Sequence, residues 1–165
     1  VGYHNPLKHP STTHKINETQ KIRETVTQLF VHTDHRNWNN VAAQFAPKVN
    51  LDYSSMTGNP TAQVSPTDII SAWKTVLPGF THTHHQLGNF IIKNNGDKAH
   101  VFCYGTATHF IKDDKGSVWT VVGSYDFDVE KIDEDWKITS MIFNYKYQNG
   151  NDKLLEKAIE NVKSN

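Results

Sequence analysis

Hydrophobic residues recur every three or four positions near the start of the chain, the spacing of an amphipathic helix. This pattern predicts a first helix over residues 16–33. Residues 1–15 lack the periodicity and contain prolines and hydroxyl side chains, so we expect a flexible N-terminal arm. A second, short helix is expected over residues 38–45, because Pro47 would end it, and alternation then predicts a strand over 49–53. The apolar face of the first helix consists of Ile22, Val26, Leu29 and Phe30.

Capping residues mark the start of a third helix. Ser65 is a favourable N-cap, Pro66 suits the first helical position, and Asp68 suits the positive end of the helix. The sequence at 78–79 is Pro-Gly, which we expect to end the helix. The apolar stripe of this helix consists of Ile69, Ile70, Trp73 and Val76.

The second half of the chain has the pattern of β-strands. Short gaps rich in Gly and Asp separate the β-rich segments, which indicates hairpins and a mainly antiparallel sheet. After these segments, apolar residues at helical spacing predict a closing helix within residues 150–165. The four predicted strand segments are 84–93, 98–112, 118–131 and 136–147.

Helices followed by a long meander give an α+β fold class. We expect a strongly curved sheet that wraps around the N-terminal helices and forms a cone with one open mouth. Gly88, Gly105 and Gly123 lie inside predicted strands, where glycine tolerates the bends that curvature requires. The 165 residues suit one domain, which we place at 16–149.

The charge balance narrows the classes of partner. Seventeen basic residues match seventeen acidic ones, so the sequence lacks the basic excess that nucleic acid binding requires. No apolar run approaches the roughly 20 residues that cross a bilayer, so we expect no membrane partner. The single Cys103 rules out an internal disulfide and suits a cytoplasmic location, although the sequence is also compatible with a signal peptide removed before residue 1.

Four polar residues are candidates for proton-transfer chemistry: Asp34, Tyr53, His85 and His109. A carboxylate, a phenol and two imidazoles suffice for acid–base catalysis if one cavity gathers them. From the residues alone, each also has a structural interpretation. Asp34 is placed to cap the next helix, His85 and His109 to be hydrogen-bonded strand residues, and Tyr53 to be part of the aromatic core.

A cluster of imidazoles also suggests a metal site. His82, His84 and His85 are close in sequence, and two of them share a strand face. A zinc site needs three or four converging ligands, which this spacing does not supply by itself. The spacing leaves a metal site open, but the family resemblance carried by the motifs below implies a mechanism without a metal, so we expect no metal and no cofactor.

Several motifs in order resemble the SnoaL-like domain of the nuclear transport factor 2-like superfamily, and within it the scytalone dehydratase family. A bacterial dehydrochlorinase acting on hexachlorocyclohexane is a more distant likeness. The resemblance covers about residues 17–149 and implies the cone fold. The shared stretches are Asp34 with Trp38-Asn39, Ala46-Pro47 through Asp52-Tyr53, Thr83-His84-His85 to Gly88, His109, and Lys131-Ile132-Asp133 with Trp136-Lys137.

The resemblance also implies roles for these residues. Asp34 and His85 would form a hydrogen-bonded dyad with His85 as the base, while Tyr53 and His109 would donate to the departing oxygen. A second water-binding tyrosine of the family is Thr33 here, and two polar substrate contacts fall at Gly123 and Tyr125. The substrate-contacting surface therefore differs from that of the family. We expect substrate contacts from Thr33, Trp38, Tyr104, Tyr125 and Phe143.

The leading hypothesis is a metal-free lyase that carries out a dehydratase-like elimination on a small cyclic or polyketide-like compound. One alternative is an isomerase of the same superfamily. Others are a non-catalytic module that binds a small hydrophobic molecule, and a dimerisation module. A homo-oligomer, dimer or trimer, is expected because the outer face of such a sheet commonly pairs with a second copy.

Overall fold

The structure is a computed structural model that describes the backbone from residue 10 and the side chains from residue 17. Residues 1–9 of the predicted arm lie outside the described residues. The first half contains α1 (Pro10–Asp34), α2 (Trp38–Ala42), β1 (Phe45–Asp52), α3 (Ser54–Thr57), β2 (Ala62–Val64), α4 (Pro66–Lys74) and the 3-10 turn η1 (Leu77–Gly79). The second half contains β3 (His82–Asn95), β4 (Lys98–Phe110), β5 (Val118–Ile132), β6 (Asp135–Gly150) and α5 (Leu154–Lys163).

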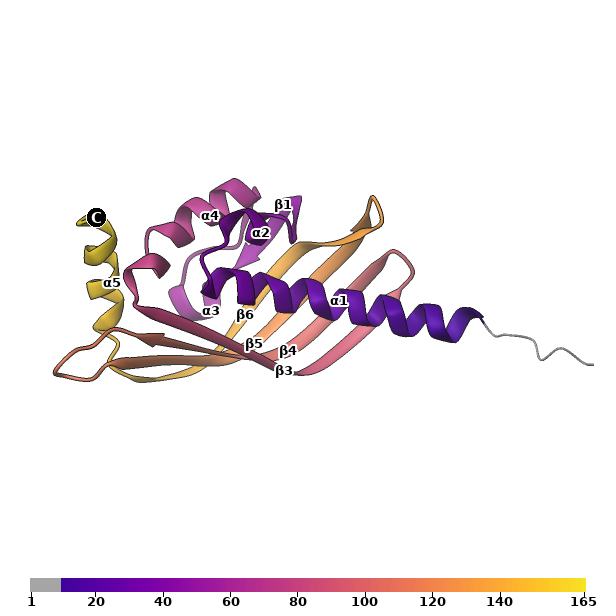
Figure 1. The fold of residues 1–165 in the computed structure, drawn as a ribbon. Helices are drawn as coiled ribbons and strands as arrows, with labels where there is room; N and C mark the ends of the chain where they lie inside the picture. The colour runs from indigo at the N-terminus through magenta and orange to yellow at the C-terminus, as the bar shows by residue number, and fades with distance from the viewer. Residues whose placement is uncertain (1–9) are drawn as a thin grey trace, which may run out of the picture.

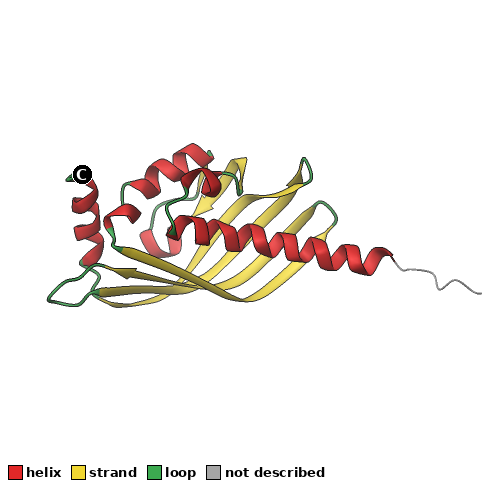
Figure 2. Ribbon diagram, in the orientation of Figure 1, coloured by secondary structure: helices red, strands yellow, loops and turns green. Residues whose placement is uncertain are grey.

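One curved, open sheet organises the molecule. Its strand order is β2-β1-β6-β5-β4-β3, and neighbouring strands are antiparallel except for the parallel pair β1 and β6. Helix α1 crosses the concave face, and α4 and α5 lie towards one end of it (Figure 1). The secondary structure in Figure 2 shows helices on this face and bare strands on the other. The predicted α+β cone is confirmed.

The core lies between α1 and the concave face of the sheet. Alternate residues of β4 point into it, from Ala99 to His109, because side chains of a strand alternate between its two faces. The predicted apolar face of α1 packs against them, with Ile22, Val26 and Leu29 fully buried. Non-local burial of this kind fixes the position of α1, and therefore of its C-terminal end, relative to the strands.

Irregularities in the sheet coincide with two of the glycines expected at bends. The register of β3 and β4 shifts between Gly88 and Ile91, and that of β5 and β6 shifts between Val122 and Gly123. Such bulges increase the local twist and curvature of a sheet. The concave face is therefore deep enough to hold a cavity beside α1.

Element boundaries differ from the prediction in the first half of the chain. Helix α1 begins at Pro10, so residues 10–15, predicted as part of the arm, are helical. Helix α2 ends at Ala42, and Phe45 begins β1 instead of ending a helix. Pro47 lies in β1 where its pairing with β6 is interrupted, as expected for a residue without an N–H to donate.

The third helix expected from the sequence is α4 in the structure, and it begins where predicted. The Ser65 side chain accepts from the Asp68 backbone N–H, and the Asp68 side chain accepts from the Ser65 backbone N–H. This reciprocal pair is a capping box, with Pro66 at the first helical position. None of the described helices is long and apolar enough to cross a membrane.

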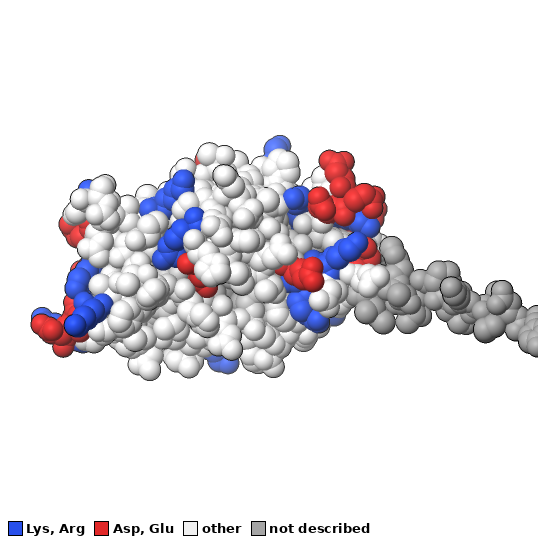
Figure 3. Space-filling model, in the orientation of Figure 1, with Lys and Arg blue, Asp and Glu red and all other residues white. Residues whose placement is uncertain are grey.

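The closing helix α5 packs over the end of the cone. Asn161 Nδ2 donates to the carbonyl of Gly79 in η1 at 3.0 Å, and Lys157 pairs with Asp113 at 3.0 Å. Figure 3 shows charged side chains at both ends of this face of the molecule and several between them. Residues 75–92, which include most of β3, contain no Lys, Arg, Asp or Glu.

Candidate functional site

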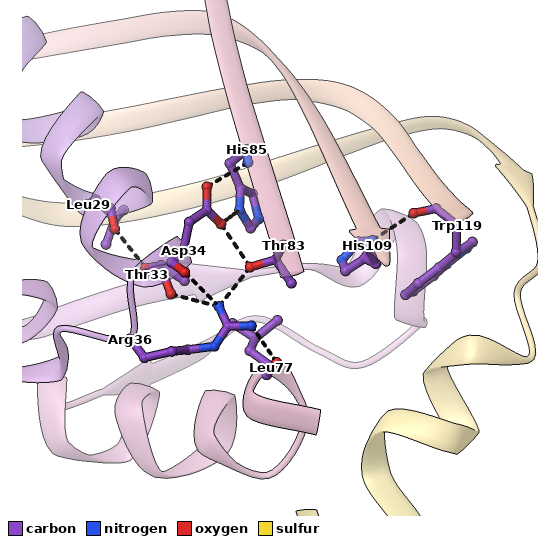
Figure 4. Close-up of polar contacts among 9 residues, drawn as sticks. All are labelled: Leu29, Thr33, Asp34, Arg36, Leu77, Thr83, His85, His109 and Trp119. Atoms are coloured by element: carbon purple, nitrogen blue, oxygen red, sulfur yellow. Dashed lines mark hydrogen bonds and ion pairs between the residues drawn. The ribbon is translucent and has the colours of Figure 1, made fainter. Parts of the chain in front are cut away.

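Asp34 is the last residue of α1, and its carboxylate points towards β3 (Figure 4). The chain turns sharply after it, because Asn37 N–H donates to His32 O at 2.9 Å and Arg36 N–H donates to Thr33 O at 3.1 Å. The residue that precedes α2 is Asn37, so the alternative in which Asp34 caps that helix is wrong. Its carboxylate is free to interact with the sheet.

The carboxylate of Asp34 accepts three hydrogen bonds from β3. His85 Nδ1 lies 2.7 Å from Oδ1, the Thr83 hydroxyl donates to Oδ1 at 2.9 Å, and the His85 backbone N–H donates to Oδ2 at 2.8 Å. Both side chains of the Asp34–His85 pair are mostly buried, with 13% and 11% exposed. The structure therefore brings together two residues that are 51 positions apart.

Electrostatics keep Asp34 ionised. Burial alone would raise the pKa of this carboxyl, but the hydrogen bond and positive charge of His85, its backbone N–H and the Thr83 hydroxyl together lower it below its usual range. An ionised carboxylate only accepts, so the His85 hydrogen lies on Nδ1. A neutral His85 then has an unprotonated Nε2 that can take a proton.

A cavity of about 320 Å³ lies beside this pair, between the concave sheet, α3, α4, η1 and α5. None of its lining residues, all of which lie in the described part of the chain, is Lys, Arg, Asp or Glu. Its polar side chains include those of Thr33, Tyr53, His85, His109 and Tyr125. Its aromatic walls come mainly from Phe30, Trp73, Phe80, Trp119 and Phe143.

His109 is the second imidazole of the cavity, and it is 6% exposed. Burial lowers its pKa to about 4, against an opposing hydrogen bond from its Nδ1 to the carbonyl of Trp119 at 3.0 Å. The ring stacks on Trp119, with centroids 4.4 Å apart. A neutral His109 that donates from Nδ1 offers Nε2 as an acceptor, so the expected donor role towards a departing oxygen does not fit this tautomer.

Two neighbouring phenols from different elements line the cavity. Tyr53 follows β1, Tyr125 lies on the inner face of β5, and each ring lies beside that of Phe143. Burial raises the pKa of Tyr53, and the adjacent phenol of Tyr125 offsets only part of that rise. Burial also raises the pKa of Tyr125. Both groups stay protonated near neutral pH and can donate hydrogen bonds.

The predicted substrate contacts divide into two groups. Thr33, Tyr125 and Phe143 line the cavity, although the Thr33 hydroxyl donates to the carbonyl of Leu29 at 2.7 Å and is left only as an acceptor. Two predictions are wrong. Tyr104 lies on the outer face of β4 and is 52% exposed, because it is an odd number of residues from the inward His109. Trp38 packs against the core outside the cavity lining.

Several residues of the site were not predicted from the sequence. Thr83 lies two residues before His85 and therefore on the same strand face. This spacing is enough to predict that Thr83 faces the site. Leu155 of α5 lines the cavity, although the C-terminal helix was placed outside the domain. Arg36 donates to the Thr83 hydroxyl and to the carbonyl of Leu77, each at 2.7 Å.

The three neighbouring histidines do not converge. His82 and His84 are exposed and, by strand alternation, on the opposite face from His85. Within the residues that the structure describes, no three His, Cys, Asp or Glu side chains are grouped closely enough to hold a metal ion.

Several solved structures share this fold. Solved structures with the same fold include the Kfla4162 protein of Kribbella flavida, with TM-score 0.79 and 21% identity over 87% of this chain and 98% of that one. A candidate scytalone dehydratase of Novosphingobium aromaticivorans has TM-score 0.72 and 20% identity over 85% and 91%. A hexachlorocyclohexane dehydrochlorinase of Novosphingobium barchaimii has TM-score 0.68 and 13% identity over 85% and 94%.

No curated protein matches the chain. The sequence does match the SnoaL-like domain family over residues 14–142, which is most of its length. The chain therefore belongs to the SnoaL-like domain family.

Proposed function

We propose that the protein is a metal-free lyase that eliminates water, or a similar leaving group, from a small uncharged cyclic or polyketide-like compound. The observation that carries the proposal is the 2.7 Å contact between Asp34 and His85 beside an apolar cavity. Membership of the SnoaL-like family, and fold similarity to a candidate dehydratase and a dehydrochlorinase, support a lyase-like or isomerase-like role.

His85 is the base in this proposal. Its Nε2 takes a proton from a carbon next to an activating group, and the electrons of that C–H bond form the new double bond. Asp34 holds the Nδ1 hydrogen and stabilises the imidazolium as it forms. General base catalysis of this kind contributes about 10²–10⁴-fold to a rate.

The two phenols and His85 act together on the leaving group. Tyr53 and Tyr125 donate hydrogen bonds to the oxygen as the C–O bond breaks, and the imidazolium of His85 supplies the proton with which it leaves as water. The dyad thus returns to its starting state without a net change. His109 accepts a hydrogen bond at Nε2 from a substrate hydroxyl, which orients the ring.

The cavity selects for an uncharged substrate. A carboxylate or phosphate would lose its hydration without meeting a cationic side chain, because the described lining contains none. A volume of about 320 Å³ is at the small end for ligand pockets. Aromatic walls favour a flat, apolar ring.

An isomerase is the second candidate. The two buried phenols, both with raised pKa, can donate to an enolate oxygen while His85 moves a proton between two carbons. A non-catalytic binder would use the same cavity without proton transfer. Product analysis separates the first two functions, because elimination releases water or halide and isomerisation releases nothing.

The test uses His85→Ala and Asp34→Asn, with His84→Ala as control. In deuterated water, the wild-type protein should exchange the acidic C–H of bound cyclic ketones and turn over hydroxylated analogues. Both site variants should lose about 10²–10⁴-fold in these rates and keep the wild-type circular dichroism spectrum. His84 is exposed on the outer face, so its removal should leave the rates unchanged. Equal exchange in the wild-type and His85→Ala proteins would rule out the base assignment.

A further inference from the structure

Arg36 has a backbone conformation that a side chain disfavours. It follows the end of α1 with φ of 60°, at the position where helices that end in this way usually have glycine. The two backbone hydrogen bonds that close this ending, Asn37 to His32 and Arg36 to Thr33, need only the backbone. A side chain retained in left-handed backbone points to a function for that side chain.

The guanidinium of Arg36 connects three segments around the dyad (Figure 4). Nη2 donates to the carbonyl of Leu77 in η1 at 2.7 Å. Nη1 donates to the Thr83 hydroxyl on β3 at 2.7 Å, and also to the carbonyls of Thr33 at 3.0 Å and Asp34 at 3.3 Å at the end of α1. One planar group therefore fixes the helix end against the strand that carries His85.

The contact with Thr83 determines where the hydroxyl hydrogen points. A threonine hydroxyl has one hydrogen. Because the oxygen accepts a hydrogen bond from Arg36 on one side, its own hydrogen must point in another direction. The hydrogen is then directed to Asp34 Oδ1 at 2.9 Å, the oxygen that also lies 2.7 Å from His85 Nδ1. Thr83 is buried, so water does not compete for this bond.

We infer that Arg36 is a positioning residue for the dyad, acting through the Thr83 hydroxyl on the Asp34 carboxylate. The inference rests on the proposed function, since it assumes that His85 is the base. Burial lowers the pKa of Arg36 and the charge of Asp34 raises it, but a guanidinium remains charged in proteins. Its positive charge is one of the influences that lower the pKa of His109, although burial is the largest.

The chain provides a matched control. Its only two arginines are Arg36 and Arg23, and Arg23 lies exposed on α1 over the ring of Phe90, away from the dyad. Arg36→Gly suits the left-handed backbone, so this variant should fold. Its kcat should fall about 100-fold, as expected for a small misplacement of a catalytic group, with KM near the wild-type value.

The acidic limb of the pH profile should also move to higher pH in Arg36→Gly, because a nearby positive charge is lost. Arg36→Lys should restore the position of that limb but not the full kcat, since an ammonium lacks the planar fork that reaches both Thr83 and Leu77. Arg23→Ala should match the wild type in both measurements. If Arg36 had a purely structural role, Arg36→Gly would lower the stability of the fold without moving the acidic limb of the pH profile.

A measurement without substrate separates this inference from the proposed function. The NMR signal of the His85 Nδ1 hydrogen reports its hydrogen bond to Asp34 in each variant. We expect this signal to move in Arg36→Gly and in Thr83→Val, because Asp34 loses the hydrogen bond that orients it. If the signal is identical in the wild-type and Arg36→Gly proteins, the inference is overturned, whereas turnover retained in His85→Ala overturns the proposed function instead.

Discussion

At the scale of single residues, two imidazoles in one cavity have different hydrogen-bond partners. The ring centroids of His85 and His109 are 6.4 Å apart, but His85 pairs with a carboxylate and His109 with the carbonyl of Trp119. A carboxylate stabilises an imidazolium, whereas a carbonyl and an aromatic stack in a buried site do so much less. The pair can therefore divide the work into one proton acceptor and one neutral orienting group.

His109 should make the fold sensitive to acid. Its pKa is lowered to about 4, from about 6.5 in an unfolded chain, so its contribution to stability is complete above pH 6.5 and is lost as pH falls towards 4. The loss should be on the order of 2–3 kcal/mol. In His109→Phe, the free energy of unfolding should change less between pH 7.5 and 4.5, as measured by urea denaturation.

Other groups do not obscure this result. The pKa of Asp34 is lowered from 3.8, so its contribution is lost only at lower pH. The pKa of His100 is raised by Asp126 and Asp128 against its partial burial, so its contribution has the opposite pH dependence. Asp34 and His100 are present in both proteins. Their contributions therefore cancel when the pH curve of His109→Phe is subtracted from that of the wild type. Parallel pH curves for the wild type and His109→Phe would contradict the prediction.

Residue-scale prediction from sequence succeeded where a periodic pattern was available. The inward direction of His109 follows from its small, apolar neighbours on the same strand face, whereas the substrate contact expected from Tyr104 overlooked the same alternation and was wrong. The pairing of Asp34 with His85 came from the family resemblance, because no local pattern relates residues on a helix end and a distant strand. The left-handed conformation of Arg36 has no sequence signal, since glycine or asparagine is the usual residue there.

At the scale of elements, the cavity depends on how α5 packs against η1. A Cβ at Gly79 would overlap the carbonyl of Ala158 in α5, and the Gly79 carbonyl accepts from Asn161. Leu155 of the same helix lines the cavity. The closeness of these two backbones therefore sets where that wall of the cavity lies.

Gly79→Ala should displace α5 and destabilise the fold by about 1–3 kcal/mol, the usual effect of overpacking a rigid contact. Gly88→Ala is the control, because a Cβ there has no heavy atom within 4 Å and Gly88 has an ordinary φ. Thermal unfolding of both variants measures the difference, and ligand affinity should fall only in Gly79→Ala. Equal melting temperatures for the two variants would disprove the tight packing.

Elements with strong end signals were predicted closely, and those without were not. The capping box fixed the start of α4, and the Gly- and Asp-rich hairpins placed all four long strands to within a few residues. Strand β2 has three residues and too little pattern to detect. Phe45 fits a helix face as well as a strand, and only pairing with β6 decides between them.

At the scale of the whole molecule, the convex face of the sheet is uncovered by any helix in residues 10–165. Large apolar side chains lie exposed on it, including Ile91 and Tyr104, and Tyr104 contacts the ring of Phe102. Ile91 is paired with Phe102 across β3 and β4. Monomeric proteins rarely expose extended apolar patches, so we propose that two copies associate through this face.

Charge on that face should separate the copies. Ile91→Glu and Tyr104→Glu should each shift the protein towards the monomer, because association would bury an unpaired carboxylate. Val31→Glu is the control, since Val31 is also exposed but lies on α1. Sedimentation velocity measures the mass of each protein. An unchanged mass in both face variants, or a monomeric wild type, would refute association through this face.

Two glycines on the concave face, Gly105 and Gly123, do not line the cavity, but aromatic rings that line it pack directly against them. A Cβ at Gly105 would overlap the ring of Tyr125, and one at Gly123 would overlap the carbonyl of Asn144 and lie 2.7 Å from two ring carbons of Phe143. Neither glycine lines the cavity, yet each determines how far an aromatic ring can recede from it. The upper size of an accepted compound is thus determined partly at positions that the compound never touches, and substrate range can change there while Asp34 and His85 keep their positions.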